Sequence, residues 1–143
     1  DTIVETELTS PITLSEPFEE HGHTWFFYDT GVPHLVCFVD DISTFNKNIA
    51  RQMRYAYNAN VNYVALHEGV LHVRTYERGV EDETLACGTG MAASFYAAYC
   101  QKMVEKSVTV YPTSKEELFL RIENERLFFK GKVEQVFETQ WKR

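Results

Sequence analysis

The chain has 143 residues, a length typical of one domain, and its 44% hydrophobic content is enough to form a buried core. Its formal net charge is -7, and the acidic residues are scattered along the sequence. A protein with this charge does not attract nucleic acid or an anionic membrane surface. We therefore exclude both as main partners and expect a small-molecule ligand.

The most apolar helical stretch, residues 91–100, is shorter than the roughly 20 residues that a membrane-crossing helix needs. No signal-peptide pattern opens the sequence, which predicts a cytoplasmic protein with no membrane partner. The sequence begins at Asp1 without a methionine, and this start suggests a fragment or a processed protein.

The first half of the sequence predicts short strands and one surface helix. Strands are expected at residues 11–14, 24–28 and 34–39, which are rich in β-branched and aromatic residues. Ser43 is a plausible N-cap for an amphipathic helix over residues 43–57, where apolar residues recur every four positions.

The second half predicts a hairpin, a buried helix and further strands. Residues 62–66 and 70–76 alternate with a period of two around a short glycine loop. Residues 91–104 read as a helix that is almost uncharged on every side at its start, which is typical of a buried helix. Strands are then expected at 107–111, 117–123, 126–130 and 132–138, with Gly131 in a turn. The sum is one α+β domain, residues 1–143, in which antiparallel strands form a barrel-like sheet around a central buried helix.

Residues 76–91, YERGVEDETLACGTGM, are the most informative segment. Cys87 precedes Gly-Thr-Gly at a predicted helix start, where free backbone N–H groups and the positive end of the helix dipole attract anions. These effects lower the pKa of a thiol, so Cys87 is expected to react faster than Cys37 or Cys100. The alternative is a small buried cysteine with no chemistry.

This segment resembles the signature around the second active-site cysteine of diaminopimelate epimerases, namely ERGV followed by ETLACGTG. Two further segments resemble the same family in the same order: DTGVPHLV at residues 29–36 is similar to its Gly-Asn-Pro-His motif, and NVNYV at residues 60–64 is similar to its substrate-binding asparagine segment.

The resemblance implies a two-domain enzyme with pseudo-symmetric halves, each a barrel-like sheet around a helix, and a substrate cleft between them. The chain would be the C-terminal half, inactive alone, and its partner would be the N-terminal half that carries the second cysteine. The implied reaction interconverts LL- and meso-diaminopimelate, in lysine and peptidoglycan precursor biosynthesis, by proton transfer at the α-carbon. It uses no cofactor and no metal, and a homodimer is compatible with it.

The resemblance also assigns roles to residues near the α-carbon. Cys87 would act as acid or base according to the substrate enantiomer. Gly88 and Thr89 would donate backbone N–H bonds to the α-carboxylate. His34 and Glu77 would hold the α-ammonium and tune the thiols.

At the other end of the substrate, Asn62 and Arg78 would bind the distal amino-acid group. Two departures from the family pattern concern this end. Val32 stands where the family usually has asparagine, and residues 79–84 are one residue longer than the commonest form of the motif.

The remaining cysteines and histidines predict no second site. Cys37 lies in a strand and Cys100 in a helix, and neither has a glycine turn beside it, so both are interpreted as packing residues. His21 and His23 provide too few ligands for a metal.

Three other functions stay open from the sequence. Another isomerase of the same fold, such as a proline racemase or a PhzF-like protein, would keep the architecture and change the substrate. A Cys/His hydrolase would use Cys87 and His34. A binding domain without catalysis would keep the fold and an unreactive Cys87.

Overall fold

The structure is a computed structural model that describes residues 3–132. In chain order its elements are β1 (Ile3–Glu7), β2 (Ile12–Thr13), β3 (Phe18–Glu20), β4 (His23–Asp29), β5 (Pro33–Phe38), the 3-10 helix η1 (Ile42–Thr44), α1 (Lys47–Tyr57), β6 (Asn60–His67), β7 (Val70–Glu77), β8 (Asp82–Thr84), α2 (Gly88–Cys100), β9 (Ser107–Tyr111), β10 (Leu118–Glu123) and β11 (Arg126–Lys132). None of the helices within this range is long and apolar enough to cross a bilayer.

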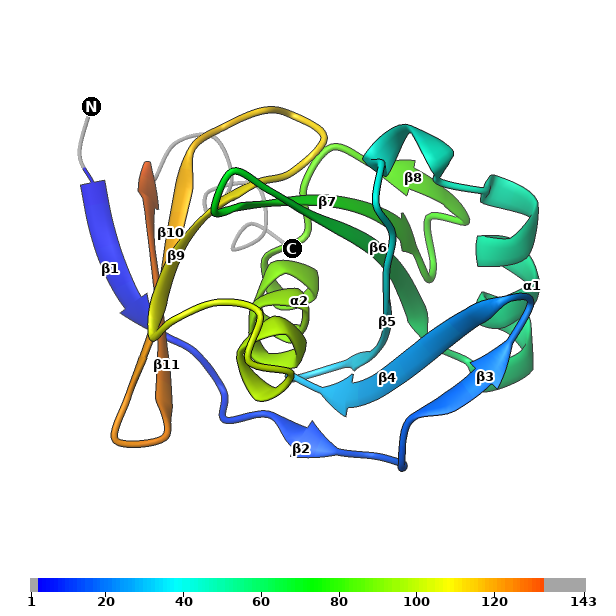
Figure 1. The fold of residues 1–143 in the computed structure, drawn as a ribbon, viewed down its shortest axis with the longest axis horizontal. Coiled ribbons are helices and arrows are strands. Elements are labelled where there is room, and N and C mark those ends of the chain that lie inside the picture. Colours follow the sequence, from blue (N-terminus) through cyan, green and yellow to red (C-terminus); the bar gives the residue numbers. More distant parts are fainter. Residues whose placement is uncertain (1–2, 133–143) are drawn as a thin grey trace.

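One large sheet curves around α2 (Figure 1). Its strands follow the order β1-β11-β10-β9-β7-β6-β5-β4-β2, with β3 paired to β4 and β8 paired to β7. The α+β class and the central helix are confirmed. The strand path ends at β1 and at β2, so the sheet is open and the barrel-like closure is not observed.

The sheet is mixed, so the prediction of a wholly antiparallel sheet is wrong at two places. Strands β5 and β6 are parallel, and so are β7 and β9. Parallel neighbours need a crossover connection. Helix α1 lies in the connection from β5 to β6, and α2 lies in the connection from β7 to β9. The helices therefore serve as the crossovers of the sheet.

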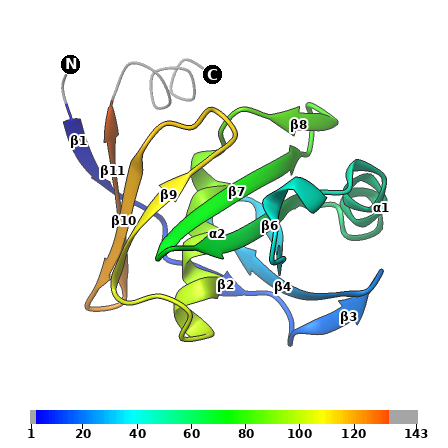
Figure 2. The same ribbon diagram turned by 45° about the horizontal axis from the view of Figure 1, so that its top comes forward.

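Helix α2 is buried on nearly every side, as its uncharged sequence predicts. Nine of its 13 residues are buried, and Met91, Phe95 and Ala98 belong to the core that the concave face of the sheet encloses (Figure 2). The helix ends at Cys100, four residues before the predicted end.

Helix α1 covers the opposite face of the sheet. It buries Ala50 and Met53 in a second core with Trp25 and Tyr63. The helix begins later than predicted, because the side chain of Asn46 accepts the N–H of Ile49 at 3.0 Å and is the N-cap. Ser43 lies in η1 instead.

The C-terminal strands differ from the prediction at one glycine. The hairpin formed by β6 and β7 is found as expected. Strands β9 and β10 are also found as expected. Gly131 lies inside β11, where it pairs with Val4 of β1, so the predicted turn is absent. The rest of the predicted strand 132–138, after Lys132, lies outside the described residues. The short strands β3 and β8 were not predicted.

The first turn of α2 approaches the sheet without room for a side chain. A Cβ atom on Gly90 would lie 2.6 Å from Oδ1 of Asn62, 3.1 Å from Cε1 of His34 and 3.4 Å from Oγ1 of Thr75. All three neighbours are buried. The glycine therefore lets the helix start rest directly on polar side chains of β5, β6 and β7.

We predict that Gly90→Ala destabilises the chain by about 1–3 kcal/mol through overpacking. Glycine to alanine inside a helix otherwise stabilises by about 1 kcal/mol, so the sign of the change separates the two effects. Chemical denaturation measures it. In an Asn62→Ala background the closest contact is gone, and the cost of Gly90→Ala should shrink. An unchanged cost in that background would contradict this account of the contact.

Candidate active site

Cys87 is the residue on which α2 begins. It is the N-cap, in an extended conformation, and its carbonyl accepts the N–H of Met91 at 2.9 Å. The preceding strand β8 pairs with β7 and brings the chain back along the sheet to this point. The sequence motif is thus placed as predicted, at the N-terminus of a buried helix.

The environment of the Cys87 thiol differs from the prediction. The side chain is only 9% exposed, and this burial raises the pKa of the thiol, with the carboxylate of Glu77 acting in the same direction. Hydrogen bonds from the Thr89 hydroxyl and from the N–H groups of Thr89 and Gly90 act to lower the pKa. Desolvation is the larger effect in the described chain, so the expected lowering of the pKa is not found.

His34 lies behind the thiol with both ring nitrogens occupied. Its Nε2 is 2.8 Å from the hydroxyl of Thr89, and its Nδ1 is 2.9 Å from the amide nitrogen of Asn62. The side chain is fully buried. Burial is the larger cause and the nearby positive charge of Arg78 the smaller one, and together they lower the pKa of His34 to about 3. The ring is therefore neutral at physiological pH.

Asn62 is also fully buried, and its amide is used inside the chain. The amide nitrogen donates to the carbonyl of Leu35 at 2.9 Å as well as to His34. The amide oxygen accepts the hydroxyl of Thr75 at 2.7 Å. These bonds favour a positioning role for Asn62, and its expected contact with the distal end of the substrate stays a prediction.

Thr89 joins the histidine to the thiol. Its Oγ1 is 3.6 Å from Sγ of Cys87, and its carbonyl accepts the hydroxyl of Thr30 at 2.8 Å. Sequence reasoning assigned only the backbone N–H of Thr89. Its side chain could have been recognised from sequence only by knowing that His34 lies beside it.

Glu77 and Arg78 end β7 on the rim of the site, and both are partly exposed. The guanidinium of Arg78 donates to the carbonyl of Asn58 at 2.8 Å. The backbone N–H of Arg78 donates to the side chain of Asn60 at 2.7 Å, and the amide of Asn60 also donates to the carbonyl of Pro33 at 3.1 Å. Asn60 thus connects β7 to the segment before His34, a role that the sequence analysis missed within the NVNYV motif.

The long segment after Arg78 is held by three ion pairs, one of which joins Asp82 to Lys47 of α1. The carboxylate of Glu81 binds the guanidinium of Arg54 on α1 through two oxygens, and it accepts the N–H of Gly79 at 3.0 Å. Glu83 in β8 pairs with Arg74 of β7 at 2.7 Å. These ion pairs tether the segment between Arg78 and Leu85 to α1 and β7.

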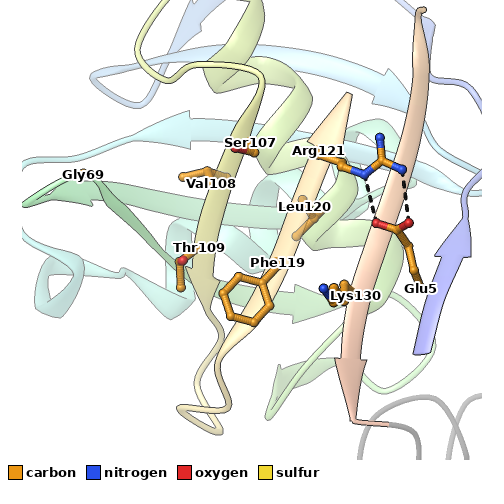
Figure 3. A pocket seen from close by; sticks show the side chains of 9 residues that line it. All are labelled: Glu5, Gly69, Ser107, Val108, Thr109, Phe119, Leu120, Arg121 and Lys130. Carbon is orange, nitrogen blue, oxygen red and sulfur yellow. Dashed lines mark hydrogen bonds and ion pairs between the residues drawn. The ribbon is translucent and has the colours of Figure 1, made fainter. Parts of the chain in front are cut away.

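Two surface hollows lie elsewhere on the described residues. One of about 500 Å³ lies over β9, β10 and β11, where Arg121 is paired with Glu5 beside Phe119 and Lys130 (Figure 3). Another of about 610 Å³ lies beside His72 and Tyr111. Neither is lined by Cys87. Within residues 3–132, no group of three or more histidine, cysteine or acidic side chains could hold a metal ion.

Cys87 should be alkylated more slowly than Cys100 and faster than Cys37 in the folded chain. Cys100 is exposed, Cys87 is nearly buried, and Cys37 is fully buried with a pKa raised far above its usual range by desolvation. Brief iodoacetamide treatment near neutral pH, followed by fragment-ion mapping of the peptides, measures the order. Labelling of Cys87 before Cys100 would contradict this order, and it would mean that the helix start increases the reactivity of the Cys87 thiol more than burial decreases it.

Several solved structures have a similar fold. The chain superposes on a hydroxyproline epimerase from Agrobacterium vitis with a TM-score of 0.66 and 12% identity, over 91% of this chain and 49% of that one. A PhzF family phenazine biosynthesis protein from Bacillus anthracis gives a TM-score of 0.63 and 13% identity, over 91% and 57% of the two chains. At these identities the likeness concerns the fold alone.

Sequence comparisons are more specific. The chain is 57% identical over 138 residues to a diaminopimelate epimerase of Nitratiruptor, over 96% of this chain and 55% of that protein. It is 51% identical over 139 residues to the enzyme of Campylobacter jejuni, over 96% and 56% of the two chains. The chain thus spans about half the length of these curated relatives. The sequence model described as diaminopimelate epimerase matches residues 26–136, and the chain belongs to the diaminopimelate epimerase family.

Proposed function

We propose that this chain supplies one half of the active site of an epimerase that interconverts LL- and meso-diaminopimelate, with Cys87 as one of two thiols that move the α-proton. The observation that carries the proposal is the position of Cys87 at the start of α2, beside the hydroxyl and N–H of Thr89. The second thiol belongs to a partner half at the other face of the α-carbon.

The proposed reaction breaks the bond between the α-carbon and its hydrogen and forms the same bond on the opposite face. The Cys87 thiolate accepts the proton from one epimer, and the opposing thiol delivers another proton to the carbanion. With the other epimer the two thiols exchange roles. The chemistry is balanced without an oxidant, a reductant or a cofactor.

The start of α2 supports this chemistry electrostatically. The α-carboxylate of the substrate would lie at the backbone N–H groups of Gly88 and Thr89, where the helix dipole is positive. As the α-proton leaves, negative charge spreads onto that carboxylate, and donors fixed in advance stabilise it. Burial raises the pKa of the Cys87 thiol and so disfavours the thiolate, whereas the hydrogen bonds from Thr89 and Gly90 act to lower that pKa and help to form the base.

The rim residues would bind the charged groups of the substrate. Glu77 is partly exposed and near enough to Cys87 to influence its pKa, so its carboxylate would hold the α-ammonium. Arg78, also partly exposed, would bind the distal carboxylate. His34 is buried behind the thiol, and we assign it to support of Thr89 in place of direct contact with the ammonium.

A Cys/His hydrolase is disfavoured by the same geometry. A histidine that activates a thiol presents an unprotonated nitrogen to the sulfur. Here Thr89 stands between Nε2 of His34 and the thiol, and Nδ1 is bonded to Asn62. The low pKa of His34 also makes it a poor base.

The decisive prediction is that this chain alone exchanges no α-hydrogen, because inversion needs a proton acceptor on one face of the carbon and a proton donor on the other. Mixing it with a separately expressed N-terminal half of the enzyme should restore exchange. Incorporation of deuterium from heavy water into diaminopimelate, followed by NMR, measures the reaction.

The matched control uses the two cysteines of α2. Cys87→Ala should abolish exchange in the mixture, whereas Cys100→Ser, at the far end of the same helix, should leave it unchanged. Exchange by this chain alone, or exchange by the mixture that carries Cys87→Ala, would refute the two-thiol proposal.

Val32 provides a test of the distal end. It is partly buried, and its carbonyl accepts the N–H of Thr30 in the turn before β5. Val32→Asn in the two-half enzyme should lower the Michaelis constant for diaminopimelate by no more than about tenfold, the size of one neutral hydrogen bond. Steady-state kinetics measures it, and a large loss of turnover would show that valine is required there.

A further inference from the structure

A continuous series of polar contacts runs from the middle of the sheet to the Cys87 sulfur. Thr75 Oγ1 lies 2.7 Å from Asn62 Oδ1, and Asn62 Nδ2 lies 2.9 Å from His34 Nδ1. His34 Nε2 lies 2.8 Å from Thr89 Oγ1, which is 3.6 Å from Cys87 Sγ. We call this series the polar chain. The function proposed above uses Cys87, Thr89 and His34, and it gives no part to Asn62 or Thr75.

The direction of each bond in the polar chain follows from Asn62. The carbonyl of Leu35 can only accept, and it lies 2.9 Å from Nδ2 of Asn62. A flipped amide would place its oxygen against this carbonyl oxygen, so the orientation of the amide is fixed. Because the Nδ2 group can only donate, His34 accepts at Nδ1. Thr75 donates to the amide oxygen and reinforces the same orientation.

The tautomer of His34 then decides what Thr89 does. A neutral imidazole that accepts at Nδ1 carries its hydrogen on Nε2, and this N–H donates to Oγ1 of Thr89. The hydroxyl hydrogen of Thr89 is then free to point at the Cys87 sulfur, which is the other neighbour of this hydroxyl in the polar chain. With the opposite tautomer, Thr89 would donate to Nε2 and not to the thiolate.

We propose that Asn62 is a positioning residue that holds His34 in its neutral Nε2–H form, so that Thr89 donates a hydrogen bond to the Cys87 thiolate. The importance of that thiolate rests on the function proposed above, but the tautomer and the hydrogen bond are properties of this chain. The contact of Gly90 with the same side chains fits the proposal, because a larger residue would displace Asn62 and His34 together.

The charges around the polar chain act against the thiolate and against a charged histidine. Burial raises the pKa of Cys87, and the carboxylate of Glu77, at the end of β7, acts in the same direction. Burial lowers the pKa of His34, and the positive charge of Arg78, beside Glu77, acts in the same direction. A hydrogen bond from Thr89 therefore stabilises the buried thiolate more than it would stabilise an exposed one, because little water reaches the sulfur.

The first test needs no substitution. In the chain with ¹⁵N-labelled histidine, imidazole nitrogen shifts distinguish the two neutral tautomers and the cation. We expect His34 in the neutral Nε2–H form from pH 5 to 8. His34 in the Nδ1–H form or as a cation at pH 7 would overturn the proposal. Asn62→Asp, which cannot donate, should move the proton to Nδ1.

The second test measures the thiol in a Cys100→Ser background. The alkylation rate of Cys87 is followed against pH, because the midpoint reports thiolate formation and the plateau reports access. Thr89→Val should raise the midpoint and lower the rate near neutral pH by about tenfold, the effect expected of one hydrogen bond to a charged group. Thr89→Ser should restore the midpoint.

Thr24→Val, at an exposed position of β4, is the matched control and should leave the Cys87 profile unchanged. An unaltered midpoint in a folded Thr89→Val chain would overturn the proposal, and so would a failure of serine to restore it. These readouts require no epimerase activity. A chain that passes both tests but restores no exchange with its partner half would contradict the proposed function alone.

Discussion

Helix α2 lies so close to the concave face of the sheet that Gly90 has no room for a side chain. The rest of the site depends on this contact. It places the first turn of the helix on Asn62, His34 and Thr75, which come from three adjacent strands. Cys87 is then held at the end of a helix that cannot shift without disturbing a buried polar cluster. A core of alanine and aromatic side chains along α2 supplies the packing that maintains the approach.

Burial has opposite consequences for the two groups at this contact. For His34 it favours the neutral ring, which is the form that can accept from Asn62 and donate to Thr89. For Cys87 it disfavours the thiolate, which is the form that can accept a proton. Hydrogen bonds from the start of α2 oppose this second effect. The hydrogen-bond donors at the start of α2 therefore act together with His34, because the neutral ring of His34 leaves the hydroxyl of Thr89 free to donate to the Cys87 sulfur.

The elements with a strong local pattern could be predicted from sequence, and the contacts between distant side chains could not. The uncharged run of α2, the hairpin of β6 and β7 and the position of Cys87 all follow from neighbouring residues. The two parallel strand pairs depend on crossovers that periodicity does not reveal. Asn62 shows the limit most clearly. Its sequence position says only that it lies on a strand, whereas its function depends on which group faces each of its amide atoms, and those groups come from β5 and β7.

The site divides into an inner wall and a rim. Asn62, His34 and Thr75 in the wall are at most 4% exposed, and their hydrogen bonds close on one another and on the backbone. The residues of the rim, from Glu77 to Leu85, are partly buried or exposed, and ion pairs with Lys47, Arg54 and Arg74 tether them. We expect a change in the wall to alter the hydrogen bonds that reach the Cys87 thiol, and a change in the rim to alter the charges around it, because burial raises the pKa of that thiol and the Glu77 carboxylate acts in the same direction.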